Sequence, residues 1–570
     1  MWLKDSVSLL KRREFINRQT IGQDLSAGLV LGIQSIPDGL ANGLLAMINP
    51  IYGLYGYMVG TFTGAFFTSS VFMSIQATSA MALVVASVPE VQAGKQPNTA
   101  LFTLAILTGL FMLLAGLLKL GSLVRFVPNA VMTGFINGVA VLIILGQLDD
   151  FTGYSSSGPN RIARTFDLLQ NLDQVHLPTL LVGLLTIVLI LTLEKTSLKS
   201  LGMVVAIVVA SLAVPLFGAE AITLVRDVAD IPASLPRPLL PTLELVPSLV
   251  IPALSLTFVG LMQGVGVSQS VPNPDGSYAD ASGDFVGQGV ANVLSGLFQG
   301  TAVGGSLSAT ALVVSAGARS RLANISAGVV MALVILFFGR FVGSIAMPVL
   351  AGLLIVVGFR TLKPTQVTMV WKTGLVQQLV MGLTFLAALF IPLQYAVLVG
   401  VALAVLLFVF QQSNKVTVKA WEIGPGQYPV ETDPPATIPP QQMTILVPYG
   451  TLFYAATPVF NEQLPQIDAQ THRAVVILSL RGQKEVGSTF LKVLTKYALK
   501  LHERESKLLL TGLEPYVVEQ MERTGVLRTI GRENIFPATE GIGMALLQGV
   551  AAGEAWLAAH QPTDTAEEID

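Results

Sequence analysis

Hydroxyl residues and glycines stand near the start of two short apolar segments. The first segment is 75–88 and the second is 306–317, and the residues concerned are Thr78, Ser79, Gly304, Gly305, Ser306 and Ser308. A helix that begins at such residues presents unpaired backbone N–H groups and about half a positive charge at its amino terminus. Hydroxyls add donors, and glycines let a ligand approach the backbone. The pattern favours an anion site; the alternative is helix packing, which also uses Ser, Gly and Ala in membranes.

Asp38 is the only acidic residue near the middle of an early apolar stretch. A carboxylate at that depth is costly, so it is expected to be functional, paired or in contact with water. We expect it to line the site as a protonatable group or a cation ligand. The alternative is a structural role, in which Asp38 caps a helix or contacts water near a turn.

The composition excludes several classes of protein. Hydrophobic residues make up 52% of the 570 residues, charged residues 12%, and the net charge is −2. Of the 68 charged residues, 37 lie in 1–414 and 31 in 415–570, which indicates a lipid-solvated part followed by a water-solvated part. A fully soluble enzyme, a disordered chain and a nucleic-acid binder are therefore excluded. The chain has no cysteine, its four histidines are scattered, and it shows no Ser/His/Asp arrangement. The sequence therefore indicates neither a metal site nor a catalytic site.

The apolar part divides at Gly, Pro and polar breaks into about fourteen segments. Residues 75–88 and 306–317 are too short to cross ~30 Å of hydrocarbon as helices, and each is third in a run of seven. This predicts a transporter domain over 21–412, built from two inverted repeats at about 21–219 and 245–412. The alternative is that both segments are shortened by the way the stretches are divided. The segments are 24–46, 51–70, 75–88, 100–118, 126–147, 177–193, 201–218, 248–269, 286–302, 306–317, 323–338, 341–359, 375–391 and 394–412.

Basic residues set the expected orientation. The segment 1–20 is basic, which favours the cytoplasm. With fourteen crossings, 16 Lys and Arg fall inside and 6 outside, so both termini are expected in the cytoplasm. The first apolar segment has no small-residue cleavage signal and is not a signal peptide.

The remaining chain has a soluble pattern. A Pro-rich stretch, 413–440, predicts an extended, semi-rigid linker. Strands are expected at 444–450, 474–480 and 507–513, and helices at 486–505 and 514–524, which together predict a small α/β domain over 441–560. An acidic tail, 561–570, follows.

Several motifs, in order, resemble the sulfate permease (SulP) family of anion transporters. They are IPDGLANGLLA (36–46), INPIYGLYG (48–56), SIQATSAMAL (74–83), DFVGQGVANVLSGLFQG (284–300) and GGSLSATAL (304–312), and the tail resembles the family's STAS domain. The resemblance runs from about residue 15 to residue 560. It implies fourteen spans as two inverted seven-helix repeats, a core domain and a gate domain, a homodimer, and elevator or rocking movement of the core.

The resemblance also implies where the substrate binds, between the ends of the third and tenth spans. Four candidates come from the first span and the eighth: Ser35, Asp38, Asn42 and Gln263. Three come from the third span, Gln76, Thr78 and Ser79, and four from the tenth, Gly305, Ser306, Leu307 and Ser308.

Three positions depart from the family pattern. Gln263 stands where many relatives have an acid, and an amide cannot titrate, so coupling to Na⁺ or H⁺ would fall to Asp38 or be absent. Ala309 stands where many relatives have Arg, which favours a monoanion such as bicarbonate, chloride or nitrate over sulfate. Asn42 replaces an aromatic residue and makes the pocket more polar. No cofactor other than a coupling ion is expected.

KEVGSTFLKVL (484–494) resembles the STAS segment that is phosphorylated in anti-sigma factor antagonists. Ser488 and Thr489 match its hydroxyls, but Gly487 and Phe490 depart from its pattern. We expect Ser488 to cap a helix, with a regulatory phosphosite at Ser488 or Thr489 as the alternative. A cytoplasmic regulator of this domain is a further expectation.

The sequence therefore predicts a secondary anion transporter of the bacterial inner membrane, not an enzyme, with a regulatory STAS tail. Two alternatives stay open. One is a nucleobase or dicarboxylate carrier of the same fold, and the other is a membrane-anchored signalling or scaffold protein with an inactive transporter core.

Overall fold

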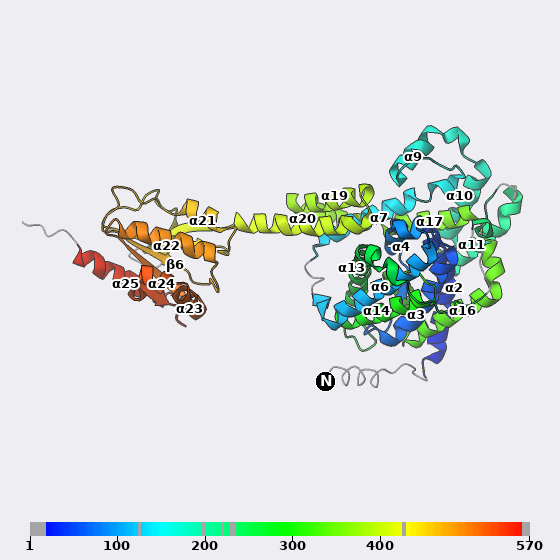
Figure 1. Cartoon of the computed structure of the whole chain (residues 1–570), viewed down its shortest axis with the longest axis horizontal. Helices are drawn as coiled ribbons and strands as arrows, with labels where there is room; N and C mark the ends of the chain where they lie inside the picture. The colour runs from blue at the N-terminus through cyan, green and yellow to red at the C-terminus, as the bar shows by residue number, and fades with distance from the viewer. Residues whose placement is uncertain are drawn as a thin grey trace, which may run out of the picture. The chain divides into compact units, whose positions relative to one another are not determined.

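The computed structural model describes residues 19–122, 127–196, 198, 201–217, 222–228, 234–423 and 429–560. Most of the basic segment 1–20 and the whole acidic tail 561–570 lie outside these residues. The chain divides into two compact units, with the boundary after Ala404 (Figure 1).

A helix coincides with each of the fourteen predicted apolar segments, and the last of these helices crosses the boundary after Ala404. In chain order they are α2 (Ile21–Leu45), α3 (Pro50–Phe67), α4 (Ser79–Ala86), α6 (Pro97–Leu117), α7 (Asn129–Leu145), α10 (Leu177–Leu193), α11 (Leu201–Ala213), α13 (Val246–Ser270), α14 (Ala281–Leu297), α15 (Leu307–Ser315), α16 (Leu322–Gly343), α17 (Met347–Thr361), α19 (Leu375–Phe390) and α20 (Leu393–Ser413). Short helices lie in the connections: α5 (Pro89–Gln92), α8 (Leu148–Thr152), α9 (Arg161–Gln170), α12 (Val225–Val228) and α18 (Pro364–Thr373).

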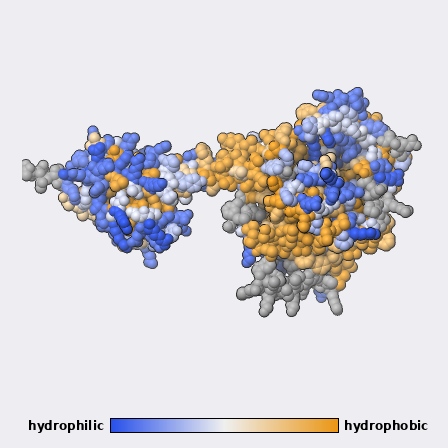
Figure 2. Space-filling view, viewed as in Figure 1, coloured by the Kyte–Doolittle hydropathy of each residue, from blue (hydrophilic) through white to orange (hydrophobic). Residues whose placement is uncertain are grey.

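Six helical stretches within the described residues are long and apolar enough to cross a membrane. They are Pro97–Leu117, Asn129–Thr152, Leu243–Ser270, Leu322–Gly339, Met347–Thr373 and Tyr395–Ser413. Exposed side chains on them are large and apolar, as Leu114 and Phe337 illustrate. Figure 2 shows an apolar surface over much of this unit and a hydrophilic surface over the other. Lipid is the solvent that such a surface requires.

Helices of the two halves of this unit interleave. α14 packs on α6 and α3, and α16 packs on α2 and α3, whereas α7 packs on α17 and α19 and α10 packs on α11 and α17. The α6–α14 crossing depends on glycine: a Cβ on Gly109 would lie 2.6 Å from the carbonyl oxygen of Gly289. The contacts thus separate a group around α14 from a group around α17, as the core and gate domains of the predicted fold require.

The third and tenth segments meet, as predicted. Each is a three-residue strand followed by a short helix: β1 (Ser74–Gln76) leads into α4, and β2 (Gly304–Ser306) leads into α15. The strands pair antiparallel, with Ser74 opposite Ser306 and Gln76 opposite Gly304.

The second unit is an α/β domain around a six-stranded sheet of order β4-β3-β5-β6-β7-β8. The strands are β3 (Thr417–Ile423), β4 (Pro429–Thr432), β5 (Met443–Tyr449), β6 (Val475–Ser479), β7 (Lys507–Leu513) and β8 (Ile535–Pro537). One face packs against α21 (Thr457–Gln463), α22 (Ser488–His502), α23 (Pro515–Arg523) and α24 (Val526–Ile530). The other face packs against α25 (Met544–Ala559).

Two expectations for this unit are wrong. The stretch 413–440 is not a free linker, because β3 pairs with both β4 and β5 and so extends the sheet. Its buried Val418 and Ala420 alternate with more exposed neighbours, which is the period of two that a strand requires. The prolines later in the stretch favoured the linker interpretation instead. Ser488 does not cap α22: Gly487 occupies the cap position, and Ser488 is the exposed first residue of the helix.

Candidate functional site

α4 begins at Ser79, shortly after β1, and α15 begins at Leu307, directly after β2, so the two helix starts lie at opposite ends of one short strand pair. Because the strands are antiparallel, the two helices leave the pair in opposite directions. Each helix is capped by the hydroxyl that the sequence indicated: Thr78 Oγ1 accepts from Met81 N at 3.4 Å, and Ser306 Oγ accepts from Ala309 N at 3.3 Å. The pairing therefore directs two electropositive helix ends at one region.

Two amide side chains of α14 complete the outer edge of β2. Asn292 Oδ1 accepts from Val303 N at 2.8 Å, and its Nδ2 donates to Val303 O at 2.6 Å. Gln288 Oε1 accepts from Gly305 N at 3.0 Å. These side chains supply the hydrogen bonds that a third strand would make, so they position β2 and the start of α15. Sequence reasoning missed them, although two buried amides four residues apart on an apolar helix are a signal.

The side chain of Asn324, on α16, hydrogen-bonds to the residues that lead into β1. Its Nδ2 donates to Phe72 O and to Met73 O, both at 3.1 Å, and its Oδ1 accepts from Ser74 Oγ at 2.7 Å. Thr310 Oγ1 of α15 accepts from Ser74 N at 3.0 Å. The connection into β1 is thereby held by the second half of the unit, and neither residue was predicted from the sequence.

Glycines allow α13 to pass directly against β2. A Cβ on Gly305 would lie 2.8 Å from the Cα of Gly264, and a Cβ on Gly304 would lie 3.2 Å from the Cα of Gly260. The backbone of β2 is therefore as close to α13 as backbone atoms permit. Gly305 was predicted from its place before the tenth segment, and the structure supplies the reason for glycine there.

The structure brings several predicted site residues into contact. Thr78 Oγ1 donates to Gln263 Oε1 at 2.8 Å, which joins the cap of α4 to α13. Gln76 Nε2 donates to Ser35 Oγ at 2.8 Å, which joins β1 to α2. Ser79, the first residue of α4, is partly exposed. Residues of α2, the third segment and the eighth segment thus form one cluster.

The predicted residues of α15 remain more open. Ser306 Oγ and Ser308 Oγ lie 3.2 Å apart, and both Leu307 and Ser308 are exposed. Ala309, at the position where the family resemblance leads one to expect Arg, is buried in the first turn. Positive potential at this end of the site therefore comes from the helix terminus and its hydroxyls.

Asp38 and Asn42 lie on α2 beside α3. Asn42 Nδ2 donates to Asp38 O at 2.9 Å and to Tyr57 OH at 2.8 Å. Asp38 is partly exposed as a whole residue, and its carboxylate forms no hydrogen bond or ion pair within the described residues. Asp38 is thus free to meet a solute or a cation.

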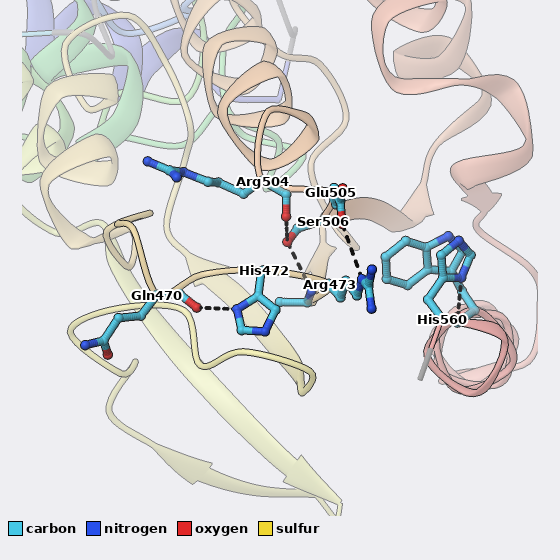
Figure 3. A network of polar contacts seen from close by, with 9 residues as sticks. Gln470, His472, Arg473, Arg504, Glu505, Ser506 and His560 are labelled. Carbon is cyan, nitrogen blue, oxygen red and sulfur yellow. Dashed lines mark hydrogen bonds and ion pairs between the residues drawn. The ribbon is translucent and has the colours of Figure 1, made fainter. Parts of the chain in front are cut away.

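A second polar cluster, in the α/β unit, does not form a site (Figure 3). Arg473 Nε lies 3.3 Å from Glu505 Oε2, Ser506 Oγ accepts from Ala474 N at 3.0 Å, and His472 Nδ1 lies 2.8 Å from Gln470 O. These contacts hold together the turns that enter β6 and β7; those of His472 and Arg473 are exposed, and the bond between Ala474 and Ser506 is buried. His472 and His502 are exposed.

Comparison with known proteins agrees with the geometry. The sulfate permease family model matches residues 21–384, and the STAS domain model matches residues 434–541. The chain is 23% identical over 553 residues to the chloroplastic sulfate transporter 4.1 of Arabidopsis thaliana, covering 92% of this chain and 80% of that protein. It is 27% identical over 351 residues to the bicarbonate transporter BicA of Synechocystis, covering 60% and 62%.

A solved structure gives the same fold. The murine Slc26a9 anion transporter in its inward-facing state superposes with a TM-score of 0.82 at 19% identity, covering 95% of this chain and 93% of that one. The family models together span most of the chain. The chain therefore belongs to the sulfate permease family of anion transporters, which are not enzymes, and carries a C-terminal STAS domain.

Proposed function

We propose that this protein is a secondary active transporter that holds a small inorganic anion between the amino termini of α4 and α15. The observation that carries the proposal is the β1–β2 pairing, which places two hydroxyl-capped helix starts beside one short strand pair. Unpaired N–H groups at such ends bind anions without a full positive charge. The eleven predicted site residues are the proposed lining.

A monovalent anion, with bicarbonate first, fits this lining better than sulfate does. The first turn of α15 carries Ala309 in place of a cation, and Asp38 adds a negative charge to α2. A dianion would meet roughly twice the repulsion from that carboxylate and no compensating side chain. The likeness to a bicarbonate transporter supports the same choice.

Transport would proceed by movement of the group around α14 against the group around α17, as an elevator or by rocking. The site residues of the third, eighth and tenth segments all belong to the first group, so the anion would travel with it. Asp38 is the proposed coupling residue, because Gln263 cannot titrate and its carbonyl is already engaged by Thr78.

The proposed setting is the bacterial inner membrane, with both termini in the cytoplasm and the protein as a homodimer. The charge asymmetry of the loops supports this orientation. The STAS domain would be the regulatory part. Ser488 and Thr489 are exposed in the first turn of α22, where a phosphate would lie at a helix amino terminus.

Purified protein in proteoliposomes tests the proposal. Labelled bicarbonate, chloride, nitrate, sulfate, succinate and uracil are offered in turn, and we expect bicarbonate or chloride to exchange above the empty-liposome level. Ser306→Leu should abolish this exchange by filling the start of α15. Ser315→Leu, at the exposed far end of the same helix, is the matched control. Failure of every anion to move, or equal transport by both variants, would refute the proposal.

A further inference from the structure

The residues between α3 and β1, 68–73, form neither a helix nor a strand, although most of them are buried. Buried backbone polar groups need hydrogen-bond partners, so other elements must supply them here. Asn324 binds the carbonyl groups of Phe72 and Met73, as described above. The first three residues, 68–70, are called the lead-in turn below. They are held by two charged side chains to which the anion site gives no role.

Asp284 binds the donors of the lead-in turn. It lies in the first turn of α14 and is fully buried. Its Oδ1 accepts from Ser70 N at 2.8 Å and from Ser69 Oγ at 2.9 Å, and its Oδ2 accepts from Ser268 Oγ of α13 at 2.5 Å. A carboxylate can only accept, and the amino terminus of a helix favours its negative charge. The donor side of the turn is therefore fixed to α13 and α14.

Arg321 binds the acceptors of the same turn. It directly precedes α16 and is 3% exposed. Its guanidinium donates to Ser69 O at 3.2 Å, to Ser70 O at 3.3 Å and to Thr68 Oγ1 at 3.3 Å. It also donates to Ala65 O at 3.0 Å, in the last turn of α3, where carbonyl groups lack helical partners and a positive charge is favoured. The acceptor side of the turn is therefore fixed to α16.

The lead-in turn is thus held from two sides by groups of opposite charge. A turn that is bound on one side only could pivot about that side, whereas binding to separate helices on both sides fixes its position and its orientation. Burial of a charge is unfavourable unless hydrogen bonds compensate it, so both side chains favour this one geometry of the turn. The strands β1 and β2 have three residues each, so their own ladder does little to specify a register. The register of β1 therefore depends on the turn that leads into it.

We propose that Asp284 and Arg321 are positioning residues for anion binding. Together they set the register of β1 against β2, and with it the placement of the start of α4 relative to the start of α15. Both act through the lead-in turn and not by contact with the anion. Loss of either side chain should displace β1 and lower anion affinity, without blocking the movement that carries the anion. The part of the inference that concerns the anion rests on the proposed function, and the part that concerns the register does not.

Cross-linking of the strand pair tests the register without any transport. The chain has no cysteine, so Ser74→Cys combined with Ser306→Cys places the only two thiols on directly opposite residues. The Cα atoms of such a pair lie about 4.5–5.5 Å apart, within the range that a disulfide spans. Purified full-length protein in detergent should therefore form the disulfide under copper phenanthroline. Addition of Asp284→Asn or Arg321→Gln should slow its formation about tenfold or more, since hydrogen bonds to charged groups hold the turn.

Exchange of labelled bicarbonate or chloride in proteoliposomes tests the consequence in the protein with its native serines. Asp284→Asn and Arg321→Lys should each raise the half-saturating anion concentration about tenfold or more and change the maximal rate much less. Lysine keeps the charge of Arg321 but lacks its planar set of donors, so charge alone should not restore binding. Ser69→Ala removes one hydroxyl donor from the turn and should act in the same direction with a smaller effect, which keeps the test valid if the charge variants fold poorly.

Asp280→Ala is the matched control, because it removes an acid at the start of the same helix. Among the described residues, the Asp280 carboxylate accepts only from Ser282 N and Gly283 N, so it caps α14 and does not bind the turn. The control should lower the unfolding temperature through loss of the cap, but it should leave cross-linking and the half-saturating concentration unchanged.

Unchanged cross-linking in both charge variants, an unchanged half-saturating concentration, or an equal effect of Asp280→Ala would overturn the inference. Slower cross-linking in the charge variants of a protein that moves none of the anions tested would support the positioning role and refute the proposed function.

Discussion

Replacement of Gly305 by alanine should separate β2 from α13 and weaken anion binding. The added Cβ would lie 2.8 Å from the Cα of Gly264 and 3.3 Å from Met73 Sδ. Carbon atoms in contact prefer about 3.5–4.0 Å, so the backbones must move apart by about 1 Å. Overpacking of this kind costs about 1–3 kcal/mol. If the whole cost falls on the binding conformation, anion affinity drops about 5- to 140-fold, because 1.4 kcal/mol is tenfold.

The assay is the half-saturating anion concentration for exchange in proteoliposomes, together with thermal unfolding of the same preparation. Gly266→Ala is the matched control, since it lies on α13 close to the contacted Gly264 but nothing lies within 4 Å of its added Cβ. That control should exchange like the wild type. A Gly305→Ala protein with a wild-type half-saturating concentration would refute the placement of the anion at the β1–β2 pair, even if its unfolding temperature fell.

Three further predictions concern single side chains. Thr78→Val removes the cap of α4, so it should lower the free energy of unfolding by about 1 kcal/mol or more and slow anion exchange. Ser87→Ala, at the other end of that helix, should leave exchange unchanged. Gln441 has a φ of 55°, a left-handed conformation that is strained for a residue with a Cβ, so Gln441→Gly should raise the free energy of unfolding by about 1 kcal/mol. Gln442→Gly, which only adds backbone freedom to the unfolded chain, should lower it by about 0.5–1 kcal/mol. Equal unfolding temperatures of the two variants would contradict this. Burial raises the pKa of Tyr497 above its ordinary value of 10.0, so the unfolded chain loses this proton first and stability falls as the pH rises past that value. Tyr497→Phe should flatten that fall in unfolding measured across alkaline pH, and an unchanged slope would contradict the assignment.

Much of the fold could be predicted because its signals are local. Apolar runs that are long enough to cross a membrane predict the long helices, and two runs are recognised as too short to do so. Strands β5, β6 and β7 were predicted from apolar runs of four to eight residues. The stretch that contains β3 and β4 was not, because its prolines suggest an extended linker and its partners lie elsewhere in the chain.

The candidate site could be predicted only in part. Thr78 and Ser306 were identified as hydroxyl residues at the starts of short apolar segments, which is a local signal, whereas their capping of α4 and α15 was seen only in the structure. Gln288, Asn292 and Asn324 were missed because their role depends on backbone groups that no sequence pattern places beside them. The contact between Asn324 and Ser74 joins residues 250 positions apart.

The sequence alone determined which parts of this protein enter lipid, which form the soluble domain, and that two interrupted segments carry hydroxyl residues at their starts. Composition and short-range periodicity decide these properties. The tertiary structure alone decided that β1 pairs with β2, that amide side chains satisfy the outer edge of β2, and that the side-chain carbonyl oxygens of Gln34 and Asn42 have no donor among the described residues. These properties depend on contacts between distant segments, and such contacts are set by the packing of the whole unit.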